Sequence, residues 1–572
     1  MKLFRSAGVC GITFLFGCVS LFQASCLAGQ GLSPDLAGKV DKVFEQWNRT
    51  DSPGCALGVY QDGKVIYKHG YGMANLNDDV TITPETVFHV ASMSKQFTAA
   101  SILLLQAQGK LSLDDDVHKY IPELPDFGEK ITLRHLIHHT SGLRDQWELL
   151  ELSGWRYSQD LITDDDVMSV VTRQKELNFK PGERYMYSNT GFTLLALVVK
   201  RVSGLSLREF TTKNIFEPLG MTHTHFRDDH EEVIKHDALG YEQDGKGKPF
   251  RMSLTNFDTT GATSLHTTVE DLQLWDENFY HPKVGGQALI DLMLHRDKLN
   301  SGELQDYASG LVIGTYKGLP TVDHNGADAG YRSDLIRFPE QHFSTAVLCN
   351  AAESNPARLA KQVVDVLLEK NLKAPDAPKV QSSTEPLPEL TAQQAAAMAG
   401  TYWFSKDDDF WTLRVKDGKL TVGDDPNDLH ALKQFAPGHF HVADVPWGND
   451  IDLHFLEGSA GKRSNLEQSF NGGKADLYEP VAAYEPSATQ LNAFSGAYVS
   501  DEIDTVYRIT VEDGKLSLHR VRHKPDALRP VMADTFAGDI GALHFKHDAK
   551  GQVTGFVLNA GRIQNLKFAK KM

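Results

Sequence analysis

The sequence predicts an α+β domain followed by two small antiparallel β-barrels, and three observations support this fold class. The chain has 572 residues, which is too long for one hydrophobic core, because cores stop growing near about 250–300 residues. A Pro-rich stretch interrupts the patterned sequence well past its midpoint. Beyond that stretch the sequence repeats itself, as a tandem pair of domains would.

The part of the chain before the Pro-rich stretch alternates between strand-like and helix-like patterns. Residues 56–60 and 64–69 flank the dipeptide Asp62-Gly63, a combination that is typical of a β-hairpin. Residues 93–108 carry the apolar spacing of a helix. We therefore expect a mixed α and β domain in this half of the chain.

The Pro-rich stretch is expected to be an interdomain linker over residues 371–389. It contains Pro375, Pro378, Pro386 and Pro388. Proline fixes φ and removes a backbone donor, so this composition disfavours both a helix and a central strand.

The repeat after the linker predicts two barrels of the same design. Each unit alternates apolar and polar residues between turn signals, with almost no helical pattern after its opening segment. This pattern is typical of a small antiparallel barrel, which places one barrel at residues 390–484 and the other at 485–572. The residues that recur at a constant offset of 96 positions are Gly400, Tyr402, Leu413, Val415, Asp417-Gly418-Lys419-Leu420 and Phe440, which return as Gly496, Tyr498, Ile509, Val511, Asp513-Gly514-Lys515-Leu516 and Phe536.

The first 28 residues have the composition of an export signal. Lys2 and Arg5 give it a basic start, residues 9–22 form an apolar stretch, and Cys26-Leu27-Ala28 is a small-x-small cleavage site. The apolar stretch is shorter than the ~20 residues that span a bilayer. We expect cleavage after Ala28, a periplasmic or secreted protein, and no stable membrane insertion. Membrane anchoring, or lipid modification at Cys18 or Cys26, is the alternative.

Two cysteines, Cys55 and Cys349, lie outside that signal. Each belongs to an apolar, strand-like run. A pair distant in sequence can bridge in an oxidising compartment, but the apolar surroundings favour two buried thiols, and that is the prediction.

Charge and composition restrict the partners. The formal net charge is −17, which excludes nucleic acid from the expected partners, because phosphate binding needs a basic surface. We expect a small-molecule or peptide substrate, and neither a cofactor nor a metal. The sequence leaves the oligomeric state open.

The segment Ser92-Met93-Ser94-Lys95 places a serine and a lysine about one helical turn apart, at the start of the helix predicted over residues 93–108. A serine hydroxyl is a weak nucleophile until a neighbour takes its proton, and a lysine held out of water can titrate low enough to help. The same spacing recurs at Ser459 and Lys462. The motif alone therefore does not identify a catalytic serine.

A second polar motif, Tyr187-Ser188-Asn189, precedes the apolar segment 192–199, which predicts a loop just before a helix. Catalytic groups often occupy such loops. A tyrosine beside cationic groups has its phenolate favoured, so it can act first as a base and then as an acid. The alternative is a tyrosine packed at the start of a helix, with Asn189 as the cap.

A third motif, His324-Asn325-Gly326-Ala327, lies between strand-like segments at residues 311–316 and 333–338. A glycine at position 326 lets the backbone approach a ligand closely, and the N–H of Ala327 can pair with that of Ser92 as an oxyanion hole. The alternative for His324 is a hydrogen-bonded surface histidine.

These three motifs, in this order, resemble the serine β-lactamase and penicillin-binding superfamily, with its S-x-x-K, Y-S-N and K-T-G-like motifs. The tyrosine resembles the class C branch. The likeness covers residues 32–370 and implies a β-lactamase-like domain with an antiparallel sheet, flanking helices and an all-helical region. It implies that Ser92 is the nucleophile, Lys95 its partner, Tyr187 the general base and acid, and Asn189 a ligand for a substrate amide or carbonyl.

His324 stands where β-lactamases usually have lysine. An imidazole holds a substrate carboxylate less firmly than a fixed ammonium, and the H-x-G form is similar to D-aminopeptidases, D-alanyl-D-alanine peptidases and esterases of the superfamily. D-aminopeptidases also carry a similar pair of lipocalin-like barrels. The resemblance therefore implies an acyl-enzyme hydrolase of D-amino acid peptides, amides or esters. A class C β-lactamase, a penicillin-binding protein and a non-catalytic binding protein are the alternatives.

A metallohydrolase is the remaining alternative, because two histidine-rich segments have the spacing of metal ligands. One contains His135, His138 and His139, and belongs to the segment that resembles the superfamily. The other contains His223, His225, Asp228, Asp229 and His230.

Overall fold

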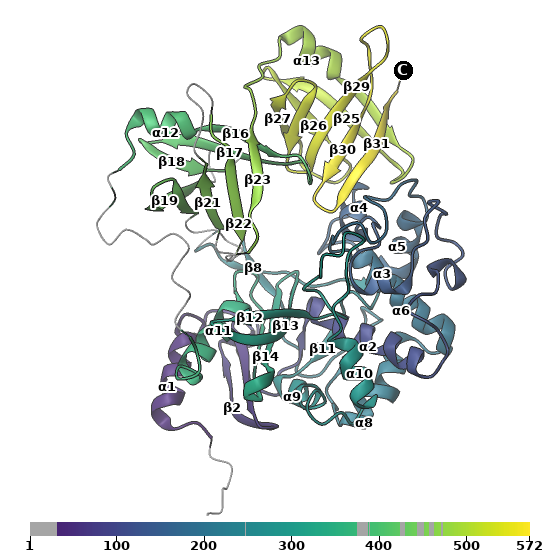
Figure 1. Ribbon diagram of the computed structural model, residues 1–572, viewed down its shortest axis with the longest axis vertical. Coiled ribbons are helices and arrows are strands. Elements are labelled where there is room, and N and C mark those ends of the chain that lie inside the picture. Colours follow the sequence, from purple (N-terminus) through teal and green to yellow (C-terminus); the bar gives the residue numbers. More distant parts are fainter. Residues whose placement is uncertain are drawn as a thin grey trace, which may run out of the picture.

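The computed structural model describes residues 31–245, 247–373, 387, 389–423, 429–442, 451–456, 463–470 and 473–571. The expected export signal, most of the Pro-rich linker and the second S-x-x-K motif at Ser459 lie outside the described residues. An α+β domain is followed by two closed antiparallel barrels, as predicted (Figure 1).

The first domain is built on a six-stranded antiparallel sheet in the order β12-β13-β14-β15-β1-β2. The predicted hairpin is confirmed, and Asp62 and Gly63 adopt the positive φ angles of 49° and 72° that its tight turn requires. The strands are β1 (Cys55–Gln61), β2 (Lys64–Tyr71), β12 (Val312–Tyr316), β13 (Leu319–Asp328), β14 (Tyr331–Phe338) and β15 (Phe343–Cys349).

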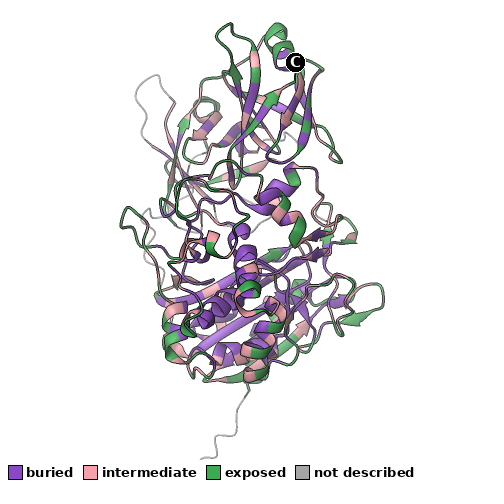
Figure 2. Ribbon diagram, turned by 90° about the vertical axis from the view of Figure 1, so that its right-hand side faces the viewer, coloured by how far each residue is buried: buried purple, intermediate pink, exposed green. Residues whose placement is uncertain are grey.

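The central strands of this sheet are buried on both faces, as β15 shows. Successive side chains on a strand point to opposite sides, so alternate residues of β15 enter different apolar clusters. On β15, Val347 and Cys349 belong to the apolar cluster that contains the helices α1 (Pro34–Val43) and α11 (Pro356–Leu367). The alternate residues Ala346 and Leu348 belong to the larger cluster on the other face. Figure 2 shows this buried interior in purple across the lower domain.

The prediction of two free thiols is wrong, because Cys55 and Cys349 form a disulfide. The residues are 294 positions apart in sequence, yet they face each other directly in the register of β1 and β15, with Cα atoms 4.0 Å apart. The apolar surroundings were recognised correctly, since both residues are fully buried. The disulfide could not be predicted because the sequence does not reveal that β1 pairs with β15.

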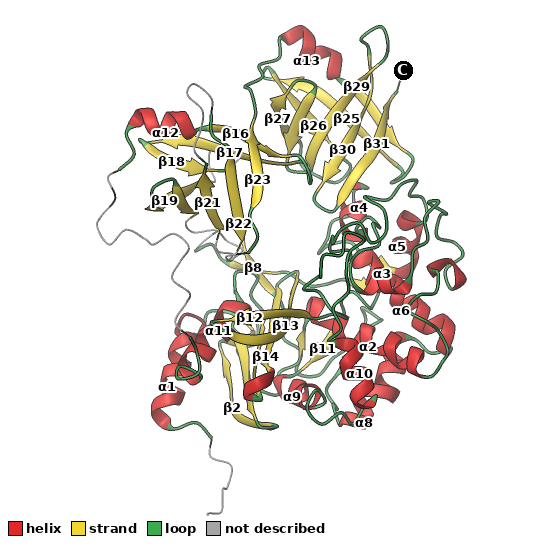
Figure 3. Cartoon of the chain, in the orientation of Figure 1, coloured by secondary structure: helices red, strands yellow, loops and turns green. Residues whose placement is uncertain are grey.

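A helical region stands beside the sheet (Figure 3). At its centre, α2 is buried almost all round and packs against α6. No single helix in the described ranges is long and apolar enough to cross a membrane. Two consecutive helical segments, residues 189–203 and 207–219, together have the length and composition of a membrane span, but they are bent by 73° relative to each other. The helices of this region are α2 (Ser94–Ala107), α3 (Leu133–Ile137), α4 (Gln146–Leu152), α5 (Asp164–Val171), α6 (Asn189–Ser203), α7 (Leu207–Thr211), α8 (Glu217–Leu219) and α10 (Gly286–Met293). A further helix, α9 (Val269–Glu277), packs on β1 and β15 of the sheet.

The two barrels share their local structure, as the repeat predicted. A short capped helix opens each unit, and the first-strand tyrosine donates back to it: Tyr402 to the Met398 carbonyl (2.7 Å) and Tyr498 to the Phe494 carbonyl (2.6 Å). The first barrel comprises α12 (Ala392–Met398), β16 (Gly400–Phe404), β17 (Asp409–Lys416), β18 (Lys419–Val422), β19 (His430–Ala436), β20 (His439–Val442), β21 (Ile451–Phe455), β22 (Leu466–Phe470) and β23 (Asp476–Pro480). The second comprises α13 (Ala488–Phe494), β24 (Gly496–Ser500), β25 (Thr505–Glu512), β26 (Lys515–His519), β27 (Asp526–Met532), β28 (Thr535–Gly538), β29 (Gly541–His547), β30 (Val553–Ala560) and β31 (Ile563–Lys570).

The second barrel docks on the helical region, beside α4 (Figure 1). A buried ion pair joins Arg144 to Glu502 (2.7 Å). Tyr507 donates to the carbonyl of Leu152 at the end of α4 (2.7 Å), and the Arg144 guanidinium also donates to the Gln564 carbonyl (2.8 Å). These contacts hold the β24–β25 connection, β25 and the start of β31 against the first domain.

Candidate active site

Ser92 lies in the short 3-10 helix η2 (Ala91–Met93), directly before α2. Ala91 has a positive φ of 49°, a conformation that is rare outside glycine and recurs at active sites. The turn also packs tightly against β13, because a Cβ on Gly326 would lie 2.3 Å from the Val90 carbonyl oxygen. Ser92 is therefore presented on a closely packed turn at the start of a helix.

Lys95 is fully buried beside Ser92. Its Nζ lies 3.1 Å from Ser92 Oγ, and it donates to Asn189 Oδ1 (2.8 Å) and to the Ala262 carbonyl (2.7 Å). Burial lowers the pKa of Lys95 to about 7. Near neutral pH a large share of this amine is therefore uncharged and able to accept the Ser92 proton.

Tyr187 lies in the loop before α6, as predicted, and stacks against His139 with ring centroids 4.2 Å apart. The Nζ atom of Lys95 lies 4.8 Å from the Tyr187 ring centroid. The expectation of a favoured phenolate is not met: burial raises the pKa of Tyr187, while hydrogen bonding with Ser92 and the charge of Arg562 act in the opposite direction. Tyr187 is thus a neutral phenol near neutral pH, and a proton donor.

Asn189 opens α6 and connects Lys95 to a buried carboxylate. Its Oδ1 accepts from Lys95, while its Nδ2 and backbone N–H donate to Asp145 Oδ2 (2.9 and 2.7 Å). Asp145 is fully buried and also caps α4. Both ends of the Asn189 amide are therefore engaged within the protein, which holds Lys95 in place.

His324 lies on β13 but is buried, with both ring nitrogens engaged. Its Nδ1 lies 2.6 Å from the Asn325 carbonyl and its Nε2 lies 3.0 Å from the Tyr307 hydroxyl. Burial lowers the pKa of His324 to about 3. The ring is therefore neutral at physiological pH, and it offers no positive charge to a substrate carboxylate.

A cleft of about 490 Å³ brings Ser92, Tyr187 and Asn189 together with Gly326 and Ala327. The close approach that Gly326 permits is to the Val90 backbone and not to a ligand, whereas Ala327 lies on the cleft wall as the oxyanion prediction requires. The residues of this wall that were not predicted as site residues are Trp147, Glu148 and Glu151 of α4, Tyr157, Ala262, Thr263, Asn325, Asp328, and Arg562 of the second barrel.

Most residues of the two histidine-rich segments make other contacts, and only Asp229 and His230 of the second segment belong to a group with metal-like spacing. His135 donates and accepts within the cap of α3, while His138 contacts the Tyr307 carbonyl. In the second segment Asp228 pairs with Arg208, and His225 lies 3.5 Å from Glu232.

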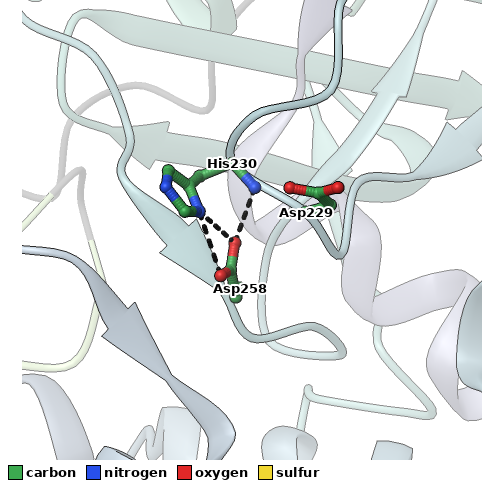
Figure 4. Close-up of side chains that lie close together, drawn as sticks. All are labelled: Asp229, His230 and Asp258. Atoms are coloured by element: carbon green, nitrogen blue, oxygen red, sulfur yellow. Dashed lines mark hydrogen bonds and ion pairs between the residues drawn. The ribbon is translucent and has the colours of Figure 1, made fainter.

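Within the described residues, the one group with metal-like spacing is Asp229, His230 and Asp258 (Figure 4). Asp258 already accepts from the His230 backbone N–H (2.6 Å), and both of its oxygens lie 3.0 Å from His230 Nδ1. These three residues are also absent from the wall of the Ser92 cleft.

Treatment of the purified protein with EDTA is expected to leave its turnover unchanged within error. The groups gathered around Ser92 are a lysine, a tyrosine and an asparagine, which need no metal to exchange a proton. The measurement is the initial rate before and after chelation and dialysis. Complete loss of activity with EDTA, followed by rescue with zinc, would revive the metallohydrolase alternative.

Comparison with known proteins connects this geometry to one family. Residues 40–369 match the family described as Beta-lactamase. Penicillin-binding protein 4* of Bacillus subtilis (strain 168) is 31% identical over 306 residues, covering 51% of this chain and 67% of that protein. Protein flp of Staphylococcus aureus (strain N315) is 30% identical over 330 residues, covering 56% of this chain. The match spans only 64% of the length of Protein flp.

Solved structures show the same fold. The octameric penicillin-binding protein homologue from Pyrococcus abyssi has a TM-score of 0.54 at 24% identity, covering 78% of this chain and 99% of that one. D-amino acid amidase from Ochrobactrum anthropi SV3 has a TM-score of 0.50 at 20% identity, covering 59% of this chain and 99% of that one.

Proposed function

Because the chain belongs to the Beta-lactamase family of hydrolases, we propose that it is a serine hydrolase that forms an acyl-enzyme on Ser92. One observation carries this proposal. The Nζ of Lys95, whose pKa burial lowers to about 7, lies 3.1 Å from the Ser92 hydroxyl. An amine that is neutral near physiological pH and within hydrogen-bond reach of a hydroxyl is what an activated serine requires.

In the proposed reaction Ser92 Oγ bonds to the carbonyl carbon of an amide or ester as its proton passes to Lys95. The oxyanion forms in the cleft beside the N–H groups of Ser92 and Ala327. Collapse breaks the bond to the leaving group, which takes a proton from the neutral phenol of Tyr187, and Lys95 returns the proton to that phenoxide. Water then attacks the acyl-enzyme by the reverse sequence, which releases the acid and restores Ser92.

We propose D-amino acid amides, peptides or esters as substrates in preference to β-lactams. The neutral, buried His324 supports this, because β-lactams carry a carboxylate that a fixed ammonium would hold more firmly. The aromatic rings of Trp147 and Tyr157 offer an apolar wall for a side chain. The same fold serves D-amino acid amidase, so it accommodates this chemistry, although fold alone does not select a substrate.

Parallel assays test this preference on one preparation of the full chain. D-alanyl p-nitroanilide or p-nitrophenyl acetate is expected to turn over with a higher kcat/KM than nitrocefin, and L-alanyl p-nitroanilide serves as the stereochemical control. Nitrocefin outpacing the other substrates would favour the β-lactamase alternative. Turnover of no substrate, together with binding of D-peptides, would favour the non-catalytic alternative.

We also propose that the protein is exported and cleaved after Ala28. The basic and apolar pattern of residues 1–28 supports this, and so does the pairing of Cys55 with Cys349, since disulfides persist in oxidising compartments. N-terminal sequencing of the protein from the periplasm or the medium is the test. A mature chain that begins at Met1 in the cytoplasm would contradict it.

A further inference from the structure

The turn between β30 and β31 of the second barrel brings Arg562 to the Ser92 cleft. Figure 1 shows these two strands running down to α4, and Arg562 lies in the cleft wall with Ser92 and Tyr187. Its guanidinium lies 5.8 Å from the Tyr187 ring centroid. The neighbouring Gly561 has a positive φ of 49°, and a Cβ there would lie 3.0 Å from the Glu148 carboxylate. The turn is therefore shaped for close approach to α4.

Two carboxylates of the first domain hold Arg562 in this position. Glu148 accepts from Arg562 Nε (2.7 Å) and from its backbone N–H (2.6 Å), and Asp145 Oδ2 lies 3.3 Å from Nη1. The side chain of Asn178 donates to the Arg562 carbonyl (2.8 Å). These contacts fix both the backbone and the charged end of the residue.

A continuous chain of contacts runs from Arg562 to the nucleophile. Arg562 pairs with Asp145 Oδ2, and the same oxygen accepts from the backbone N–H and from Nδ2 of Asn189. The other end of the Asn189 amide accepts from Lys95, which lies 3.1 Å from Ser92 Oγ. A barrel residue is thus linked to the proposed base through two buried side chains.

We propose that Arg562 is a positioning residue of this active site, which acts through Asp145, Asn189 and Tyr187, so that the second barrel completes the catalytic site. The inference rests on the proposed serine hydrolase function. The inference also predicts an electrostatic effect of Arg562 on Lys95. A permanent positive charge beside the cleft disfavours the protonated form of Lys95.

Burial lowers the pKa of Lys95 most, the negative charge of Asp145 opposes that effect, and the positive charge of Arg562 lowers the pKa further. Burial lowers the pKa of His324 to about 3 and lowers that of His139, so both rings are neutral. Burial raises the pKa of Asp328 to about 7 and raises that of Tyr187. The titratable and charged groups that face Lys95 are His139, Asp145, Tyr187, His324, Asp328 and Arg562.

The test is the rate at which a fluorophosphonate probe phosphonylates Ser92, with loss of fluoride, measured as a function of pH in the full chain. The acid limb of this profile is the range in which the rate falls as Lys95 becomes protonated. Removal of the charge in Arg562→Gln is expected to move the acid limb of this profile upward by about half to one pH unit. Arg562→Lys, which keeps a charge, is expected to retain the wild-type limb. Burial raises the pKa of Glu148 to about 7, so Glu148 carries only part of its charge over the acid limb. Glu148→Gln is therefore expected to move the limb downward by a smaller amount.

Lys567→Met is the matched control, because Lys567 pairs with Glu176 at the same barrel contact but lies outside the cleft wall. Its profile is expected to match the wild type. The inference would be overturned if Arg562→Gln and Glu148→Gln both kept the acid limb at the wild-type pH while their labelling rates fell equally at every pH. Arg562 would then have only a structural role. Failure of the wild type to label at Ser92 would instead overturn the proposed function.

Discussion

Replacement of Ser92 by alanine is expected to abolish hydrolysis, with kcat/KM falling by a factor on the order of 10⁴ or more. The Ser92 hydroxyl on the η2 turn is the proposed site of the covalent bond, so its removal leaves nothing to form the acyl-enzyme. The measurement is kcat/KM on the best substrate of the panel. The melting temperature is expected to change little, because Ser92 is only half-buried.

Ser101→Ala is the control for that variant. Ser101 is a buried serine on α2, and its hydroxyl donates to the carbonyl of Phe97 (2.8 Å) within the same helix. It is expected to retain wild-type turnover. An Ser92→Ala protein that keeps more than a tenth of the wild-type kcat/KM would remove Ser92 from the role of nucleophile.

Replacement of Lys95 by methionine is expected to lower kcat/KM by about 10²- to 10⁴-fold, the usual contribution of a positioned proton acceptor. Methionine fills much of the same buried volume, but it leaves Asn189 Oδ1 and the Ala262 carbonyl without their donor. Lys95→Arg tests whether the charge of Lys95 or its ability to accept a proton is needed, because a guanidinium keeps the positive charge but stays protonated. It is expected to be as inactive as Lys95→Met.

The pH dependence of the wild type follows from the same residue. Burial lowers the pKa of Lys95 to about 7, so the amine is protonated and unable to accept a proton at lower pH. The value of kcat/KM is expected to rise as the pH increases through about 7 and then to level off. Substantial activity in Lys95→Arg, or a wild-type profile that is flat from pH 5 to pH 8, would contradict a role for Lys95 as base.

Local patterns predicted much of this architecture. The Asp62-Gly63 hairpin, the helix that follows Ser92 and the loop position of Tyr187 depend on neighbours in sequence, and the structure has each of them. The repeat predicted the barrels for the same reason, since Asp417-Gly418 and Asp513-Gly514 form equivalent turns with φ angles near those of the first hairpin.

The features that sequence reasoning missed depend on contacts between distant segments. The Cys55–Cys349 disulfide follows from the register of β1 against β15, and Arg562 reaches the cleft through the docking of a barrel that begins far downstream. Neither has a local signal. The neutral states of His324 and Tyr187 are set by burial, which the identity of a residue does not reveal.

The central claim, covalent chemistry at Ser92, is tested most directly by mass spectrometry of the full chain after reaction with a fluorophosphonate probe. The account predicts one adduct per chain, located by peptide mapping on the peptide that contains Ser92, with no adduct in Ser92→Ala. Labelling of Ser459 or another residue, or no adduct at any pH at which the protein is folded, would contradict it.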